Sequence, residues 1–283
     1  MDKKWYNKNM EKYMIAIDLD GTLLPDLYSL SEYSIKVFRR LNELGHKVII
    51  TTGRPLRSSF FVYDAFKLDT PIINYNGCLI SNPSQNHKVL LSKEMNIKSV
   101  MKLYNDLKGS YTLFFCESYD DIYSNIESDE VKLLMHYNDK ANLYVGDLNK
   151  ILKVNPHGSL ILATDDGVDK MMKYIKENLT DIGARVWKWG PYKNIIELYT
   201  LSFDKGQAIR YVREQLGFKK ENTIACGDSQ NDFEFFSEAG IKVSLKNADE
   251  SIKKISDYVY DEDCANSGLA KFFNDFFDLK IEE

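Results

Sequence analysis

The sequence contains little cysteine, and the cysteines it has are far apart. The four occur at positions 78, 116, 226 and 264, and no two of them form a CxxC pair. This spacing excludes the common zinc-site patterns and gives no indication of a disulfide framework. We interpret the four as buried or half-buried free thiols in a reducing compartment, and we expect a cytoplasmic protein.

Long apolar runs and an excess of positive charge are also absent. No apolar stretch approaches the roughly 20 residues that cross a bilayer. Residues 1–11 are polar and lack the apolar segment of a secretory signal, so we interpret them as a short surface extension. The 42 acidic residues outnumber the 37 basic ones, for a net charge of −5. Nucleic-acid binders usually carry a basic face, so we expect neither nucleic acid nor a membrane as a partner.

Strand and helix patterns alternate at both ends of the chain. Ser31 as N-cap and Gly45 as C-cap delimit a predicted helix over 31–44. The Asn76-Gly77 pair predicts a hairpin that returns as a strand over 78–80. This order predicts an α/β fold with a doubly wound, Rossmann-like parallel sheet buried on both faces. The expected strands are 13–18, 47–51, 71–74, 222–226, 241–244 and 257–260, and the further helices are 55–67, 205–216, 230–238, 248–255 and 266–277.

The middle of the chain has a different pattern, in which several strands accompany two or three helices. Such a pattern is typical of an α+β unit on an antiparallel sheet. We therefore predict a core in two parts, 1–81 and 197–283, with an inserted α+β cap domain at 82–196; a length of 283 residues fits two domains. Residues 82–88 are predicted as a loop. The expected cap helices are 96–108, 128–139 and 167–179, and the strands are 111–116, 119–124, 149–154, 159–164, 185–188 and 194–199.

Polar groups follow several of the predicted core strands. Ligands bind open α/β sheets in the crevice at the carboxyl ends of the strands. Each group alone is consistent with an ordinary turn, a helix cap or a solvated lysine. Together they supply acids for a hard cation such as Mg²⁺ and a threonine and lysine for an anion. They are Asp18 and Asp20 in DLDGT, Thr52 and Gly53 in TTGRP, Lys205 in DKG, and Asp228, Asn231 and Asp232 in GDSQND.

The order DLDGTL, TTGRP, DKG and GDSQND resembles the haloacid dehalogenase (HAD) superfamily. It is more closely similar to the Cof-type (class IIB, C2-cap) sugar-phosphatase-like subfamily, which inserts a large α+β cap between the second and third motifs. With INYNG at 73–77 and VSLKNADESIKK at 243–254, these motifs span the predicted core. The cap resembles the family in position, size and strand–helix content. The resemblance implies a Mg²⁺-dependent phosphatase that hydrolyses small phosphorylated metabolites, such as sugar phosphates, through an aspartyl-phosphate.

The resemblance also implies a role for each motif residue. Asp18 would be the nucleophile, and Lys205 would neutralise it and the phosphoryl oxygens. Asp20 would protonate the leaving alcohol and then deprotonate the hydrolytic water, while its backbone carbonyl holds Mg²⁺. The implied metal ligands are Asp18, Asp20, Asp228, Asn231 and Asp232, and the implied phosphate and substrate contacts are Thr52, Gly53, Arg54, Asn76 and Lys205.

Several alternatives stay open from the sequence. The same chemistry serves a phosphomutase or phosphotransferase, and a non-catalytic metabolite-binding module is a third possibility. Arg54 is either a substrate contact or a surface arginine at a helix start, and Lys246 is either a solvated loop lysine or a residue at the site's rim. Both a monomer and a homodimer fit. Some polar and aromatic cap residues are candidates to face the substrate, although aromatic residues in such a cap are more often core residues and a histidine in NPHGS is more often a turn residue. They are His157, Trp187, Lys188, Trp189, Tyr192 and Lys193.

Overall fold

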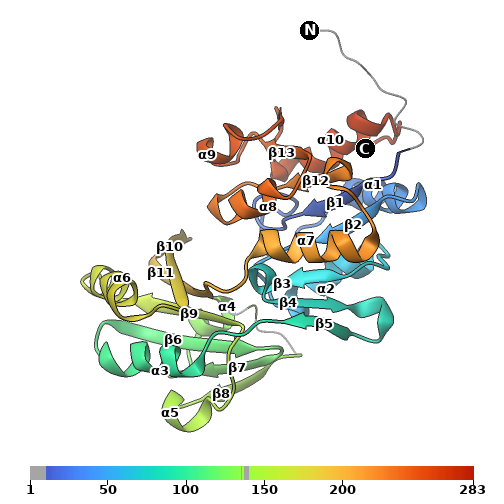
Figure 1. Cartoon of the computed structure of the whole chain (residues 1–283). Helices are drawn as coiled ribbons and strands as arrows, with labels where there is room; N and C mark the ends of the chain where they lie inside the picture. The colour runs from blue at the N-terminus through green and yellow to red at the C-terminus, as the bar shows by residue number, and fades with distance from the viewer. Residues whose placement is uncertain (1–10, 135, 137–139) are drawn as a thin grey trace. The chain divides into compact units, whose positions relative to one another are not determined.

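The computed structural model describes residues 11–134, 136 and 140–283, and its chain forms two compact units (Figure 1). The first, the core unit, comprises the chain up to Gly53 together with 59–90 and 205–283; the second, the cap unit, comprises 54–58 and 91–204. The domain limits at 81/82 and 196/197 stay a prediction. Of the surface extension expected at 1–11, only Glu11 is among the described residues. The helix expected at 128–139 also ends in residues that are not described, 135 and 137–139.

The core unit is built on a parallel sheet of five strands in the order β14-β13-β12-β1-β2. The central strand β1 pairs with β2 and with β12, and all four of its residues are buried. A strand covered on both faces reads as a continuous apolar run, and MIAI has that composition. The predicted doubly wound α/β core is confirmed. The strands are β1 (Met14–Ile17), β2 (Lys47–Ile50), β12 (Thr223–Cys226), β13 (Ile241–Leu245) and β14 (Tyr258–Tyr260).

Helices cover this sheet. The Ser31 side chain accepts a hydrogen bond from the Ser34 amide, so the predicted N-cap of α1 is confirmed. Phe38 of α1 packs against Phe273 of α10 with ring centroids 5.6 Å apart, while α7 and α8 contact each other. The helices are α1 (Glu32–Glu43), α2 (Leu56–Ala65), α7 (Lys205–Leu216), α8 (Phe233–Ser237), α9 (Glu250–Lys253) and α10 (Gly268–Phe277).

A second, three-stranded sheet of the order β3-β4-β5 begins beside the end of β2. β3 (Ile72–Asn74) and β4 (Leu79–Asn82) form the predicted hairpin, and β5 spans Lys88–Ser92. β3 meets the end of β2 through a bridge between Thr51 and Ile73. The loop predicted at 82–88 is wrong at both ends, because β4 includes Asn82 and β5 begins at Lys88.

The cap unit contains a six-stranded sheet in the order β10-β11-β9-β6-β7-β8. Apolar residues such as Phe114, Ile161, Met171 and Ile196 form its main buried cluster. Its strands are β6 (Tyr111–Ser118), β7 (Asp121–Ser124), β8 (Asn142–Val145), β9 (Gly158–Ala163), β10 (Ile182–Trp189) and β11 (Tyr192–Thr200), and its helices are α3 (Ile97–Asp106), α4 (Asp129–Leu134), α5 (Leu148–Ile151) and α6 (Gly167–Asn178).

The strand predicted at 149–154 is wrong. Its first residues belong to α5, because the Asp147 side chain accepts a hydrogen bond from the Asn149 amide and caps a helical turn there. The strand of this region is β8, which precedes the helix and pairs in parallel with β7. Within the described ranges, no helix is both long enough and apolar enough to cross a membrane.

Candidate active site

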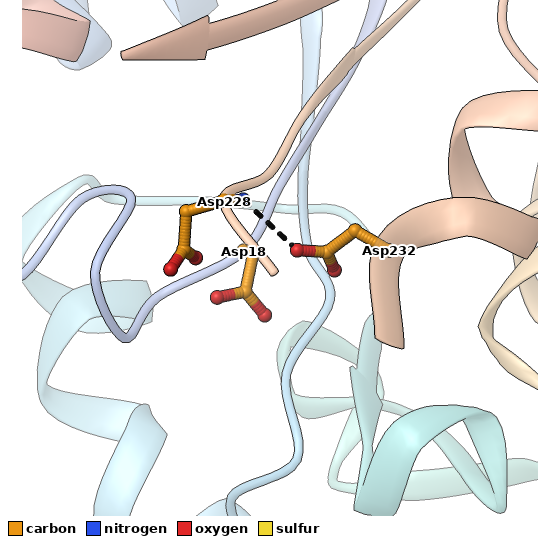
Figure 2. A group of neighbouring side chains, drawn as sticks. All are labelled: Asp18, Asp228 and Asp232. Atoms are coloured by element: carbon orange, nitrogen blue, oxygen red, sulfur yellow. Dashed lines mark hydrogen bonds between the residues drawn. The ribbon is translucent and has the colours of Figure 1, made fainter. Parts of the chain in front are cut away.

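Three aspartates converge at the carboxyl ends of the central core strands. Asp18 directly follows β1, and its amide still donates to the Cys226 carbonyl (2.9 Å), as in the sheet. Asp228 and Asp232 lie in the segment that follows β12. Figure 2 shows the three carboxyl groups gathered in one place, and an oxygen of each lies within 4.8 Å of the others.

Lys205, the first residue of α7, is the buried cation of this cluster. Its Nζ lies 2.5 Å from Oδ1 of Asp18 and 2.8 Å from Oδ1 of Asp232, and its side chain is 1% exposed. Burial by itself lowers the pKa of the Lys205 ammonium, but the charges of Asp18 and Asp232 outweigh burial and raise that pKa. Lys205 is therefore protonated, and it compensates one of the three carboxylate charges.

The pKa values of Asp18 and Asp228 stay strongly raised despite this lysine. Burial raises the pKa of Asp18 well above its usual range, Lys205 opposes the rise, and Asp232, Asp228 and Asp20 add to it. Burial and the charge of Asp232 raise the pKa of Asp228 to about 7, against a hydrogen bond from Thr22 and the charge of Lys205. Like charges held together in a buried site favour protonation unless a cation is added.

The donor set fits a divalent cation. Three ionised carboxylates and one lysine leave a formal charge of −2, and carboxylate oxygens are the ligands that Mg²⁺ prefers. Asp18 and Asp228 would hold the ion, with Asp232 beside them. Because burial and neighbouring acidic charges raise the pKa values of Asp18 and Asp228, a cation beside these two carboxyl groups would also stabilise their ionised forms.

The turn after Asp18 is shaped to receive Asp228. Gly21 has a φ of +76°, and a Cβ at this position would lie 2.4 Å from Oδ2 of Asp228. The Thr22 hydroxyl donates to Oδ1 of Asp228 (2.9 Å), and the Asn247 side-chain amide donates to the Gly21 carbonyl (2.7 Å). The sequence interpretation gave no role to Thr22 or Asn247, although both lie inside stretches it singled out.

Asp232 organises the loop between β12 and α8. Its Oδ2 accepts hydrogen bonds from the amides of Asp228 (3.0 Å) and Ser229 (3.2 Å). A Cβ on Gly227 would lie 2.6 Å from the Asp232 carboxyl group, so the backbone must pass close to it. With its other oxygen on Lys205, Asp232 orients this loop in addition to carrying charge.

The remaining core residues singled out from the sequence lie in the adjoining loops. Thr52 is fully buried, and its amide donates to the Ile73 carbonyl (3.0 Å). Gly53 follows it and faces the side chain of Asn76. The side-chain Nδ2 of Asn231 donates to Oδ1 of Asn76 (3.2 Å). Thr52 and Asn231 are thus joined through the turn that contains Asn76.

Asp20 and Lys246 are exposed, whereas Arg54 is buried. Asp20 is exposed, yet its charge raises the pKa of both Asp18 and Asp228. Arg54 is buried and donates to the Ser58 carbonyl (3.2 Å), so the surface-arginine alternative is wrong. Lys246 is exposed and pairs with Asp261 (3.0 Å), as expected of a solvated loop lysine.

In the cap unit, His157 lies in the bend before β9, as expected of a turn residue, and its side chain is buried. Its Nε2 lies 2.8 Å from the Ser92 hydroxyl oxygen. Burial lowers the pKa of His157 to about 4, against the opposing charge of Glu94. Lys188 and Lys193 are exposed, Trp187 and Tyr192 are half-buried, and the Trp189 side chain lies outside what the structure describes.

Comparison with known proteins agrees with this fold. Residues 15–273 match the family described as haloacid dehalogenase-like hydrolase. The chain is 31% identical over 272 residues to the 5-amino-6-(5-phospho-D-ribitylamino)uracil phosphatase YitU of Bacillus subtilis strain 168, covering 94% of this chain and 98% of that protein. A Thermotoga maritima crystal structure is 27% identical with a TM-score of 0.77, covering 93% of this chain and 97% of that one.

The fold also matches that of a solved HAD subclass IIB sugar phosphatase, at 19% identity and a TM-score of 0.76, over 94% of this chain and 99% of that one. At this identity the likeness concerns the fold alone. The family match covers nearly the whole of both parts of the core and the segment between them. The chain therefore belongs to the haloacid dehalogenase-like hydrolase family and is a phosphatase of that family.

Proposed function

We propose that the chain is a Mg²⁺-dependent phosphatase that hydrolyses small phosphorylated metabolites through an aspartyl-phosphate on Asp18. The observation that carries this proposal is the buried contact of Lys205 with Asp18 beside Asp228 and Asp232. A carboxylate can approach a phosphate dianion only where positive charge offsets their repulsion. Lys205 supplies part of that charge, and Mg²⁺, when bound by the aspartates, supplies the rest.

The reaction proceeds in two displacements. An oxygen of Asp18 forms a bond to phosphorus while the bond from phosphorus to the ester oxygen breaks, and Asp20 gives its proton to the leaving oxygen. Asp20 then takes a proton from water, and that water oxygen bonds to phosphorus as the Asp18–phosphorus bond breaks. Inorganic phosphate leaves and both aspartates regain their starting states. The exposed position of Asp20 at the start of the loop suits a group that exchanges protons with substrate and water.

We further propose a phosphorylated sugar alcohol as the first substrate to test. The 31% identical Bacillus subtilis relative is named for hydrolysing 5-amino-6-(5-phospho-D-ribitylamino)uracil, whose phosphate is carried on a ribityl chain. That compound and hexose phosphates belong in the same assay, because both are small phosphate monoesters of polyhydroxylated chains. A turnover rate far higher on the ribityl phosphate would support the narrower assignment.

The test is release of inorganic phosphate by the purified chain with Mg²⁺, first from p-nitrophenyl phosphate and then from these metabolites. Asp18→Asn should lower the rate by about a thousandfold or more. Asp64→Asn, at an exposed aspartate paired with Lys67, is the matched control and should keep full activity. Undiminished activity in Asp18→Asn contradicts the nucleophile assignment, and formation of hexose phosphate isomers without phosphate release identifies a phosphomutase.

A further inference from the structure

The side chain of Asn76 connects two loops that are far apart in the sequence. Its Oδ1 accepts a hydrogen bond from the side-chain amide (Nδ2) of Asn231, 155 residues later (3.2 Å). Asn76 has φ 53° and ψ 33°, a left-handed conformation that asparagine adopts more readily than most residues. A Cβ on Gly53 would lie 3.3 Å from both the Oδ1 and the Nδ2 atoms of Asn76. The Asn76 amide therefore packs directly on Gly53 and also holds Asn231.

Each side of this contact continues into a proposed binding loop. On one side, the backbone amide of Asn76 donates to the Thr52 carbonyl (3.0 Å). On the other side, the Ser229 hydroxyl donates to Oδ1 of Asn231 (2.5 Å), and the Ser229 amide donates to Oδ2 of Asp232 (3.2 Å). An unbroken chain of hydrogen bonds thus runs from Asp232 to Thr52.

We propose that Asn76 is a positioning residue that couples the Thr52–Gly53 loop, where phosphate binds, to the Asp228–Asp232 loop, where Mg²⁺ binds. The proposal rests on the proposed function and on the roles that the resemblance implies, with Thr52 and Gly53 as phosphate contacts and Asp228, Asn231 and Asp232 as metal ligands. Asn76 is hydrogen-bonded to one loop through its backbone amide and to the other through its side chain, so order imposed on one loop is available to the other. Phosphate and Mg²⁺ should therefore bind more tightly together than their direct attraction alone provides.

Such coupling is reciprocal, so it has a measurable size in either direction. Mg²⁺ should lower the dissociation constant of inorganic phosphate, and phosphate should lower that of Mg²⁺ by the same factor. Loss of a residue that orients metal ligands typically weakens metal binding about 10- to 100-fold. We call the factor by which each ligand lowers the other's dissociation constant the coupling factor. Removing the side-chain amide of Asn76 should accordingly reduce this factor by about tenfold. Part of it should stay, because the two ligands also attract each other directly.

Asn76→Gly is the decisive variant. Glycine adopts the positive φ and keeps the backbone amide that donates to Thr52, so only the side-chain link is lost. Asn86→Gly is the matched control, since Asn86 also has a left-handed conformation (φ 58°, ψ 44°) and lies in the exposed turn before β5. Asn231→Ala breaks the same link from the other side.

The experiment is calorimetric titration of inorganic phosphate into the full chain with and without Mg²⁺, which needs no turnover. We expect the coupling factor to fall about tenfold in Asn76→Gly and in Asn231→Ala, with no further fall in the double variant, and to stay unchanged in Asn86→Gly. The proposal is overturned if Asn76→Gly weakens phosphate binding equally with and without Mg²⁺ and the effects of the two variants add in the double variant. Asn76 would then be a direct phosphate contact.

Failure of the positioning role can be distinguished from failure of the proposed function. If the wild-type chain hydrolyses p-nitrophenyl phosphate and Asn76→Gly keeps the full coupling factor, only the positioning role is overturned. If the wild-type chain binds neither inorganic phosphate nor Mg²⁺, both proposals are overturned together.

Discussion

The Nζ of Lys205 lies 2.5 Å from Oδ1 of Asp18, although 187 residues separate them in the sequence. The same nitrogen contacts Asp232, 27 residues further along (2.8 Å). One buried ammonium therefore joins the end of β1, the start of α7 and the loop that follows β12. It serves the stability of the core as well as the chemistry proposed for the site.

Replacing this lysine should destabilise the fold. Lys205→Met leaves two carboxylates buried without their cation, and removal of one partner of a buried pair typically costs about 3–5 kcal/mol. We expect a loss of this size in the free energy of unfolding, measured by urea denaturation at pH 8 without metal. Added Mg²⁺ should restore part of it by offsetting the same charges.

The matched control is Lys246→Met, which removes an exposed lysine paired with Asp261. Exposed ion pairs contribute little to stability, so its urea midpoint should stay near that of the wild type. Equal shifts in both variants would contradict a structural role for the buried ammonium.

Gly21 and Gly217 offer a second matched pair, because their φ angles are +76° and +73°. Alanine at either position meets a left-handed backbone, a cost of about 1–2 kcal/mol. Only at Gly21 does the new Cβ collide with the Asp228 carboxyl group, whereas at Gly217 it meets no heavy atom of the described residues within 4 Å. Both variants should lose stability, but only Gly21→Ala should weaken Mg²⁺ binding, by about 10- to 100-fold. Calorimetric titration of Mg²⁺ measures this, and equal affinities in the two variants would refute it.

His46 predicts how stability depends on pH. It is buried, accepts a hydrogen bond from the Tyr13 amide through Nδ1 (3.1 Å), and stacks on Tyr13. Burial, aided by the charge of Lys12, lowers the pKa of His46 from 6.5 to about 4. The unfolded chain therefore takes up this proton first as the pH falls. The contribution of neutral His46 to the free energy of unfolding is complete above pH 6.5. It is lost progressively as the pH falls to 4, by about 3 kcal/mol.

His46→Asn should remove this step, because its side-chain oxygen accepts from the Tyr13 amide and does not titrate. Urea unfolding of both proteins between pH 7 and pH 4 measures the difference in slope. Burial also lowers the pKa of His157. This histidine is present in both proteins, so it contributes the same pH dependence of stability to each. Parallel stability curves would show that His46 is not the group responsible.

The elements with the clearest local signals could be predicted from the sequence. The buried run at β1 and the helix capped by Ser31 lie within one or two residues of their expected limits. The stretch around α5 failed because ILKV is too short for periodicity to separate a strand from a helix, and the decisive contact is the cap formed by Asp147. β8 was missed because three of its four residues are exposed, so it has little apolar pattern.

The site divides in the same way. Residues at the ends of parallel strands were expected near one sheet edge, since parallel strands end together, and Asp18 and Asp228 lie there. The link between Asn76 and Asn231 could not be predicted, because it depends on the path of two loops rather than on strand direction. The burial of Arg54 is likewise a consequence of packing that no local pattern records.

The pairing of β1 with β12 constrains how the protein is made. Met14 lies beside Thr223, so the central strand of the core lacks one neighbour until more than two hundred later residues have left the ribosome. The cap unit, continuous from 91 to 204, emerges before that neighbour. One edge of the apolar β1 therefore stays unpaired while the cap unit is synthesised, and unpaired apolar strands of this kind favour aggregation.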